Sequence, residues 1–269
     1  MNGEAMKFDV CMWAKNGEKY LPRVLKRIDE VIPSEVMGEK IFVDDSSTDK
    51  SVEIAKDFNW NIYHNEKGWI NGGTEVALKH VKTDLFISVE QDVVLTKNFM
   101  SLLKHFDDPK TAVACGVYYP TVKYGRMYFI HHINELRKGK VGFIAIGSNM
   151  YRTKYIRELG FVKDKIAMLD FYNRVNNSEY KWITDYDVVS DHIRESFWVD
   201  LQHFDRIYRT QKSKSFLDDK SLPRAVGMVM KSVVYLRCGN PIIPVLEAMV
   251  RFKFLELYLT TRRGMGKQS

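Results

Sequence analysis

The sequence lacks several features that would place a protein of this size in a specialised class. Only three of its 269 residues are cysteines, Cys11, Cys115 and Cys238, and no C-x-x-C pair occurs. This spacing argues against a disulfide framework, and the two cysteines in apolar runs are expected to be buried. No apolar segment of signal-peptide type opens the chain, and Met6 is an alternative start. We therefore expect a reducing, cytoplasmic compartment.

The sequence also lacks an internal repeat, a low-complexity tract and a compact basic-aromatic module, so we expect no nucleic-acid partner. A hydrophobic content of 45% and a charged content of 28% are ordinary for a soluble globular protein. The charge is uneven, because residues 206–269 carry 13 Lys and Arg against 4 Asp and Glu, while the whole chain carries +7. This basic tail predicts contact with an anionic surface such as phospholipid, or with a phosphorylated substrate.

Strands and helices are predicted to alternate through the first 120 residues. Short apolar runs predict strands at Phe8–Trp13, Lys40–Val43, Trp60–Tyr63, Leu85–Val89 and Thr111–Tyr119. One helical pattern begins at Leu21, and a second follows Ser47 or Thr48, either of which can cap it. Two more helices are predicted at Thr74–Lys82 and Asn98–Phe106. This alternation indicates βαβ units, and therefore an α/β fold with a mainly parallel sheet.

The pattern changes after Pro120. Tyr124–Lys140 is basic, aromatic and irregular. Later segments predict a strand and then a turn over Gly142–Met150, a strand at Tyr186–Ser190, and helices at Thr153–Leu159 and Asp170–Asn176. We therefore divide the chain into residues 1–120 and 121–221, as two halves of one α/β domain, and a helical extension at 222–269.

The extension contains two apolar stretches, Ala225–Leu236 and Ile242–Thr261. Neither satisfies the roughly 20 predominantly apolar residues that a spanning helix needs. In the second, Glu247 and Arg251 lie on the helical face opposite Lys253 and Glu256. One interpretation is a helical extension that packs on protein. The other is peripheral attachment to the inner face of a membrane, with basic residues meeting anionic lipid: Arg206, Arg209, Lys212, Lys214, Arg262 and Arg263.

Acidic residues follow two of the predicted strands. Asp44 and Asp45 begin a D-D-S-S-T-D segment, and Glu90 and Asp92 follow the strand at Leu85–Val89. Open α/β sheets bind ligands at the carboxyl ends of their strands, and hard divalent cations prefer oxygen ligands. The alternative interpretation is helix capping and solvated turns. Taken together, the two segments predict a metal-assisted nucleotide site at two neighbouring strand ends.

These segments resemble a family 2 glycosyltransferase with the GT-A fold. Val10–Glu18 resembles the first-strand K-N-x-E variant of that family, Ile41–Asp49 its V-D-D-x-S-T-D turn, Ala77–Asp84 its G-L-K-H-A-K-G-D, and Phe86–Asp92 its D-x-D position. Gly147–Phe161 is similar to its acceptor-side G-S…R…G-F segment. The resemblance covers Phe8 to about Leu102 and, more weakly, Gly147–His192.

The resemblance implies that a sugar moves from a UDP- or GDP-sugar to an acceptor, with inversion at the anomeric carbon and with Mn²⁺ or Mg²⁺. Residues 1–120 then bind the nucleotide sugar, and residues 121–221 face a sugar or lipid-linked acceptor. The implied donor-binding residues are Trp13, Lys15, Asn16, Asp44, Asp45, Glu90 and Gln91. Asp92 is the implied metal ligand, with His192 beside it, although a lone histidine after a strand is more often structural.

The chain departs from the family pattern at three places. Ala167 and Met168 replace an acidic pair, which leaves Asp170 as the nearest candidate for the catalytic base, with Asp164 and the His131-His132 pair in reserve. Asp170 could equally face a helix dipole. Glu75 and the Glu90-Gln91 pair also differ from the residues that relatives often have.

These departures keep a second function open, namely a catalytically inactive nucleotide-sugar-binding partner of a GT-A enzyme. A nucleotidyltransferase is disfavoured, because no Gly-rich basic loop follows the first strand, only Ala14–Glu18.

Overall fold

The computed structural model describes residues 6–140, 142–145, 147–162, 168–199, 201, 226–227, 230 and 232–265. The chain falls into two compact units. Unit 1 is built from Met1–Tyr119 with Ile133–Ile193, and unit 2 from Pro120–His132 with Arg194–Ser269. Unit 2 thus combines a segment from the middle of the chain with the C-terminal segment. The predicted boundary at residue 221 lies outside the described residues.

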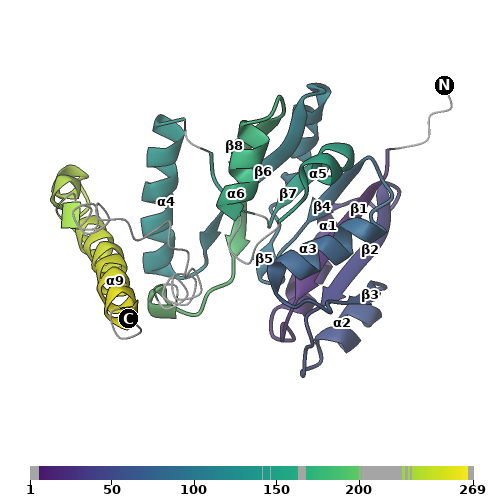
Figure 1. Cartoon of the computed structure of the whole chain (residues 1–269), viewed down its shortest axis with the longest axis horizontal. Helices are drawn as coiled ribbons and strands as arrows, with labels where there is room; N and C mark the ends of the chain where they lie inside the picture. Colours follow the sequence, from purple (N-terminus) through teal and green to yellow (C-terminus); the bar gives the residue numbers. More distant parts are fainter. Residues whose placement is uncertain are drawn as a thin grey trace. The chain divides into compact units, whose positions relative to one another are not determined.

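Unit 1 is built on an eight-stranded sheet in the order β3-β2-β1-β4-β7-β6-β8-β5 (Figure 1). Its first four strands are parallel: β1 (Phe8–Ala14), β2 (Met37–Asp44), β3 (Asn61–His64) and β4 (Leu85–Ser88). Three helices connect them: α1 (Leu21–Val31), α2 (Ser51–Asp57) and α3 (Trp69–His80). The predicted alternation of strands and helices is confirmed in this part of the sheet.

The other half of the sheet contains antiparallel pairs. The strand β7 (Asn149–Arg152) pairs antiparallel with β4 and with β6 (Thr111–Pro120). The short β5 (Val93–Val94) follows β4 in the chain but pairs antiparallel with β8 (Lys181–His192). The sheet is therefore mixed, and it curls so that the segment after β4 reaches β8. Unit 1 also contains η1 (Phe99–Asp107), a 3₁₀ helix, with α5 (Thr153–Leu159) and α6 (Met168–Asn176).

An apolar core covers each face of this sheet. Successive side chains of a strand point to opposite faces, so one strand contributes to both cores. On β1, Phe8, Val10 and Met12 join residues of α1, α2 and η1 in one core. Cys11 and Trp13 join residues of α3, α5 and α6 in the other. Cys11 and Cys115 are fully buried, as predicted, and burial raises the pKa of the Cys115 thiol to about 11.

A buried carboxylate links η1 to β8. Asp185 is 7% exposed and lies 2.8 Å from Lys104 Nζ and 2.9 Å from His105 Nε2. Burial opposes ionisation, but these partners bring the pKa of Asp185 down to about 2. A carboxylate with a lowered pKa stabilises the fold only while it is ionised, so unit 1 is expected to lose stability in acid.

The segment Tyr124–Lys140 forms a regular helix, α4 (Lys123–Lys138), so its prediction as irregular was wrong. Tyr128 packs in the core of unit 2, whereas Ile133 packs with Val117 and Phe143 of unit 1. The helix changes its packing partners midway, and no single apolar stripe runs along it. Its periodicity is therefore weak in the sequence.

Several element boundaries also differ from the prediction. Neither Ser47 nor Thr48 caps α2; Asp49 Oδ1 instead accepts a hydrogen bond from Ser51 N at 2.9 Å. The helix α3 begins at Trp69 rather than Thr74. The strand-then-turn order predicted over Gly142–Met150 was wrong, because residues 142–145 form no strand and β7 begins only at Asn149. The glycine-rich start of α3 interrupts the helical apolar pattern, whereas residues 142–145 are apolar and yet form no strand.

Unit 2 contains the first turns of α4 together with η3 (Ser232–Arg237), a 3₁₀ helix, and α9 (Ile242–Met265). Its core consists of Tyr128, Leu201, Ile243, Leu246 and Val250. The helix predicted over Ile242–Thr261 is confirmed. Across the parts of the chain that the structure describes, no helix combines the length and apolar character needed to cross a bilayer.

The charges of α9 lie on different faces, as predicted. Glu247 is 3% exposed and lies 2.8 Å from Arg251 Nε, whereas Lys253 pairs with Glu256, which is 54% exposed. Burial works to lower the pKa of Arg251, but its hydrogen bond to Glu247 raises it. Of the tail residues predicted to meet lipid, four lie outside the described residues: Arg206, Arg209, Lys212 and Lys214.

Candidate functional site

The two acidic segments lie on either side of β1, and the prediction that they follow neighbouring strands was wrong. In the register of the sheet, Ala14 pairs with Asp44 in β2, and Cys11 pairs with Ser88 in β4. Backbone after β1 bridges the segments, because Asp45 N donates to Ala14 O at 2.9 Å and Lys15 N donates to Gln91 Oε1 at 2.9 Å. Both segments therefore reach one end of the sheet.

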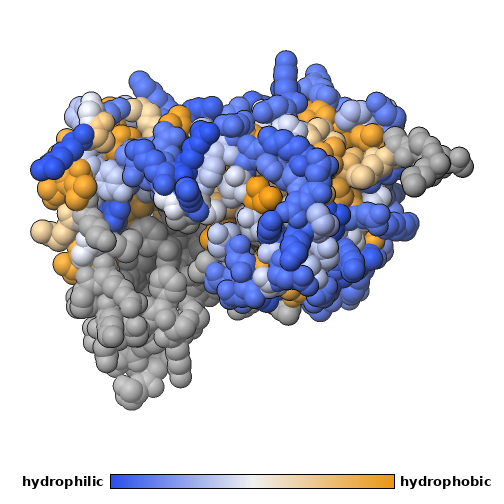
Figure 2. Space-filling model, turned by 90° about the horizontal axis from the view of Figure 1, so that it is seen from above, coloured by the Kyte–Doolittle hydropathy of each residue, from blue (hydrophilic) through white to orange (hydrophobic). Residues whose placement is uncertain are grey.

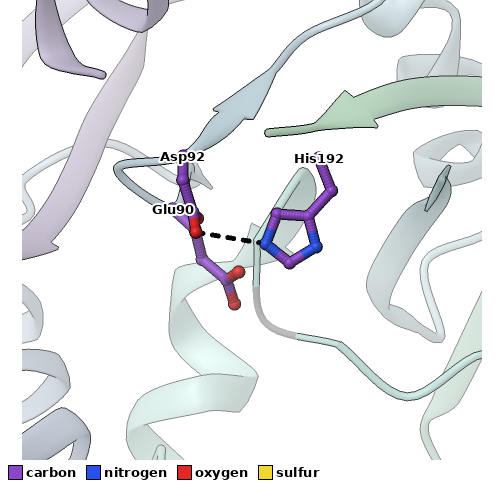
Figure 3. A group of neighbouring side chains, drawn as sticks. All are labelled: Glu90, Asp92 and His192. Carbon is purple, nitrogen blue, oxygen red and sulfur yellow. Dashed lines mark ion pairs between the residues drawn. The ribbon is translucent and has the colours of Figure 1, made fainter. Parts of the chain in front are cut away.

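Glu90, Asp92 and His192 form a cluster that we call the acidic-histidine trio (Figure 3). One ligand atom from each residue lies within 4.8 Å of the others. His192 Nε2 lies 3.3 Å from Asp92 Oδ2. Adjacent ligands of an octahedral cation with bonds of about 2.1 Å lie about 3 Å apart. The spacing of this pair therefore suits two ligands of one cation.

The β5–β8 pairing brings the trio together from segments that are far apart in the sequence. Val93 pairs with His192, and Ile193 N donates to Asp92 O at 2.8 Å. Gly147 leaves room for the third member, since a Cβ atom at residue 147 would lie 2.6 Å from Glu90 Cγ. The trio therefore depends on antiparallel pairing and on a glycine opposite Glu90.

The environment of His192 fits a metal ligand. The side chain is buried, and the Tyr118 ring packs against it with a centroid distance of 4.6 Å. Although Asp92 is within ion-pair distance, Nε2 makes no hydrogen bond to any residue that the structure describes. A buried polar atom left in this state is unfavourable unless a ligand satisfies it. The two carboxylates suit Mn²⁺ or Mg²⁺, and a neutral imidazole nitrogen is a common metal ligand.

Asp44 and Asp45 differ in their surroundings. Asp44 is 8% exposed, and both of its carboxylate oxygens lie 3.2 Å from Ser47 N, which donates to them. The Asp45 side chain is 22% exposed, lies 3.9 Å from Lys15 Nζ and accepts a hydrogen bond from Asn65 Nδ2 at 3.1 Å. Asp44 therefore closes the turn after β2, while Asp45 remains accessible beside a cationic group.

The other residues predicted to bind the donor shape the loop after β1. Gln91 also donates from Nε2 to Lys15 O at 3.2 Å, and Asn16 Oδ1 accepts from Thr48 N at 2.8 Å. Trp13 is 9% exposed, and its ring meets Phe161 edge-to-face at 6.0 Å. The structure thus places the Trp13 ring in the core, whereas Gln91 and Asn16 hold the loop together.

Hydrogen bonds lower the pKa of two carboxylates near this loop, Asp49 and Glu75. Burial works to raise the pKa of Asp49, but hydrogen bonds from Ser51 and from the backbone N–H of Glu18 bring it below its usual range. At the second departure from the family pattern, Glu75 accepts a hydrogen bond from Lys67, which lowers the pKa of Glu75, and lies 3.3 Å from Lys79. Glu75 therefore holds the segment that precedes α3.

Asp170 lies in the first turn of α6 with 56% of its side chain exposed. It accepts a hydrogen bond from Arg174 Nε at 2.8 Å, and Arg174 is itself anchored by backbone carbonyls, including that of Gly160. Asp170 is not a member of the trio. Of the reserve candidates, Asp164 lies outside the described residues, and His131 packs against Tyr235 in unit 2.

Asn65 was missed in the sequence. It directly follows β3 and is 3% exposed, its N–H donates to Asp44 O at 2.8 Å, and its side chain donates to Asp45. The available signal was its position, because a polar residue at the carboxyl end of a parallel strand faces the ligand-binding edge of the sheet.

Comparisons with known proteins show similarity in sequence and in fold. The family described as Glycosyl transferase family 2 matches residues 9–179, and a comparison with curated proteins finds no match. Glucosyl-3-phosphoglycerate synthase from Mycobacterium tuberculosis, in complex with Mn²⁺, UDP and glucosyl-3-phosphoglycerate, is similar to this chain with a TM-score of 0.56. The identity is 16%, and the alignment covers 80% of this chain and 82% of that chain.

Two further structures are similar. TarS residues 1–349 from S. aureus, in complex with UDP-GlcNAc, has a TM-score of 0.55 and 14% identity over 98% of this chain and 93% of that chain. A mannosyltransferase from Pyrobaculum calidifontis, in complex with GDP-Man and Mn²⁺, has a TM-score of 0.56 and 14% identity over 98% of this chain and 76% of that chain.

At these identities the similar structures show the fold, and the family match shows the relationship. That match covers more than half of the chain, from β1 through α6, and includes Asp45, Glu90 and Asp92, although it ends before His192. The chain therefore belongs to glycosyl transferase family 2, a family of glycosyltransferase enzymes, and has their GT-A fold.

Proposed function

We propose that this chain moves a sugar from a UDP- or GDP-sugar to a sugar or lipid-linked acceptor, with inversion at the anomeric carbon. Mn²⁺ or Mg²⁺ would be bound at the donor diphosphate. The observation that carries this proposal is the acidic-histidine trio, whose ligand atoms lie within 4.8 Å of one another. Similar structures support the donor class, because they contain UDP with Mn²⁺, UDP-GlcNAc, or GDP-Man with Mn²⁺.

The carboxylate of Asp45 supports a preference for some nucleobases of the donor over others. An ionised carboxylate can only accept hydrogen bonds, so it suits a base edge that presents a ring N–H. Uracil and guanine both present such an N–H group, whereas the corresponding ring nitrogen of cytosine accepts. Lys15, whose Nζ lies 3.9 Å from Asp45, would add a positive charge near the nucleotide. Asp45 therefore favours UDP- and GDP-sugars over CDP-sugars.

The trio would hold the cation through Glu90, Asp92 and His192. When bound, a divalent cation neutralises the charge that develops on the diphosphate as its bond to the sugar breaks. In an inverting displacement, the acceptor oxygen forms a bond to the anomeric carbon from the side opposite the diphosphate. The bond from that carbon to the diphosphate breaks, and a base takes the hydroxyl proton of the acceptor.

We assign the role of base to Asp170. Its carboxylate is exposed, and the anchored Arg174 holds its orientation, which supports a positioned proton acceptor. The variant Asp170→Asn is isosteric but cannot take the proton, so transfer should fall by roughly 10²–10⁴-fold with nucleotide affinity unchanged. Near-normal transfer by this variant would assign the base elsewhere, with Asp164 the next candidate.

The experiment that tests the proposed function measures nucleotide binding and turnover separately. Thermal stability would be recorded with UDP, GDP, CDP and dTDP, each with and without Mn²⁺, because a ligand of the folded state raises its stability. We expect a Mn²⁺-dependent shift with UDP or GDP, followed by transfer or slow hydrolysis of the matching sugar nucleotide. Binding without any turnover would instead indicate an inactive nucleotide-sugar-binding partner of another enzyme. The absence of any shift would contradict the donor site itself.

We also propose that unit 2 makes peripheral contact with the inner face of an anionic membrane, which would present a lipid-linked acceptor. Three aliphatic side chains of η3 are exposed by 59–69%: Val233, Val234 and Leu236. Figure 2 shows hydrophobic surface over the part of unit 2 that contains η3 and α9. The excess basic charge of residues 206–269 supports an anionic partner.

Membrane contact is tested by sedimentation with vesicles. The protein should sediment with vesicles that contain phosphatidylserine and not with vesicles of phosphatidylcholine alone, and high salt should weaken binding. Replacing Val233, Val234 and Leu236 together by serine should release the protein while leaving Mn²⁺-dependent nucleotide binding intact. Unchanged sedimentation of this variant would show that η3 does not contact the membrane.

A further inference from the structure

Trp69, the first residue of α3, combines an uncommon backbone conformation with an exposed ring. Its φ is 62°, in the left-handed region, and it follows Gly68, whose φ is 65°. The residue is 49% exposed. Large side chains rarely adopt positive φ, and such residues persist where the surrounding structure holds them and where they often serve a site. Trp69 is therefore a candidate for a role that a glycine could not fill.

One buried side chain connects Trp69 to Asp45. Asn65 Nδ2 donates to Trp69 O at 2.8 Å and to Asp45 Oδ1 at 3.1 Å. Asn65 is 3% exposed, so this amide is shielded from competing water. The backbone of Trp69 is thus held at a defined position relative to the carboxylate that is proposed to bind the base.

The rest of the segment is packed against the same group of residues. A Cβ atom at Gly72 would lie 2.2 Å from Asn65 Oδ1, and one at Gly73 would lie 2.7 Å from Trp13 Cβ. The ion pairs of Glu75 with Lys67 and Lys79 hold the segment from its solvent side. Close packing on one side and ion pairs on the other allow the strained conformation of Trp69 to persist.

The chemistry of the two side chains is complementary toward a nucleobase. Asp45 offers hydrogen-bond acceptors to the edge of a base, while an exposed indole offers an apolar π-face on which any base can stack. We propose that the indole ring of Trp69 stacks on the heterocyclic base of the nucleotide donor whose N–H edge binds Asp45. This inference rests on the proposed function. It assigns Trp69 to donor affinity, in addition to the residues that the family resemblance implies.

The test compares ligands with and without a base. Affinities for UDP, GDP and inorganic pyrophosphate, each with Mn²⁺, would be measured by calorimetry for the wild-type protein, Trp69→Gly, Trp69→Phe and the control Trp198→Phe. Trp69→Gly should bind UDP or GDP about tenfold more weakly, as expected for the loss of one stacked ring. Its pyrophosphate affinity should not change, because pyrophosphate has no base. Trp69→Phe should recover most of the nucleotide affinity.

Stability and fluorescence separate stacking from a structural role. Glycine tolerates positive φ, so Trp69→Gly should melt no lower than the wild-type protein while binding nucleotide less well. Nucleotide should quench the tryptophan fluorescence of the wild-type protein and of Trp198→Phe, and most of this quenching should disappear in Trp69→Phe.

Three outcomes would overturn the inference. Equal weakening of nucleotide and pyrophosphate binding in Trp69→Gly would mean that Trp69 only maintains the loop. Unchanged nucleotide affinity in Trp69→Gly, with Mn²⁺-dependent binding by the wild-type protein, would refute stacking while leaving the proposed function intact. Failure of the wild-type protein to bind any nucleotide would refute both together.

Discussion

Removing one ligand from the acidic-histidine trio is predicted to abolish Mn²⁺-dependent nucleotide binding. Asp92→Asn keeps the size of the side chain but removes a formal charge, and His192→Ala removes the buried nitrogen that makes no hydrogen bond to the described residues. Because one atom from each member lies within 4.8 Å of the others, each substitution should remove one of three protein ligands from a single cation. Both variants should therefore lose Mn²⁺-dependent nucleotide binding while remaining folded.

The expected size of the effect follows from mass action. At a Mn²⁺-nucleotide concentration of 100 times Kd, binding stabilises the wild-type protein by about 2.7 kcal/mol. Even residues that only hydrogen-bond to a metal ligand are worth up to about 100-fold in metal affinity, so a direct ligand should be worth at least that much. A 100-fold loss leaves about 0.4 kcal/mol of stabilisation at the same concentration. For a chain of this size the ligand-induced shift in Tm should shrink by roughly 5–9 °C.

The assay is a thermal melt of each variant with and without Mn²⁺, at fixed UDP or GDP. Asp187→Asn is a matched control, because it removes the same charge from β8 at a side chain that is 74% exposed and pairs with Arg137. The control should keep the full Mn²⁺-dependent shift. A wild-type shift in Asp92→Asn and His192→Ala would refute the assignment of the trio as the metal site. Equal loss in the control would show that the effect is only general electrostatics.

Three further predictions test the support of the site and of the two units. Gly147→Ala should weaken Mn²⁺-dependent nucleotide binding, measured by calorimetry, because the new Cβ would lie 2.6 Å from Glu90 Cγ; unchanged binding would show that Glu90 can move without loss. The pKa of Asp185 is lowered to about 2 from a usual 3.8, so its ionised form adds stability that is present above about pH 4 and is lost toward pH 2. The variant Asp185→Asn should therefore be about 1–2 kcal/mol less stable at pH 7. Urea titrations should also show that its stability depends less on pH in acid. Glu247→Gln leaves Arg251 without its buried ionic partner and should destabilise unit 2 by up to about 3 kcal/mol, as measured by hydrogen exchange; protection equal to wild type would contradict a role for this pair in stability.

The sequence predicts the first half of unit 1 well because local signals determine it. Apolar runs of strand length, helical periodicity and a polar turn after each strand all point to the same βαβ arrangement, and the structure confirms the parallel pairs among β1 to β4. The acidic segments were visible for the same reason, since each directly follows a strand. What local signals do not specify is strand order, which is why β1 was not expected between β2 and β4.

Long-range pairing and mixed packing explain most of the differences. The helix α4 packs one part of its length in unit 2 and another in unit 1, so no continuous apolar face identifies it. The antiparallel strand β7 lies between β4 and β6, although it follows both in the chain. Asn65 carries no motif, and its importance arises only when β3 pairs with β2 and places it beside Asp45.

The assignment of His192 depends most on the structure. A lone histidine after a strand is more often structural, and the family match ends before this residue. Its case rests on one topological event, the pairing of the two-residue strand β5 with the end of β8, which sets Val93 opposite His192 and so brings the imidazole to Asp92. Buried polar side-chain atoms usually have a hydrogen-bond partner inside the fold. The buried Nε2 instead makes no such bond among the described residues and lies 3.3 Å from a carboxylate oxygen, as a nitrogen poised to bind a shared cation would.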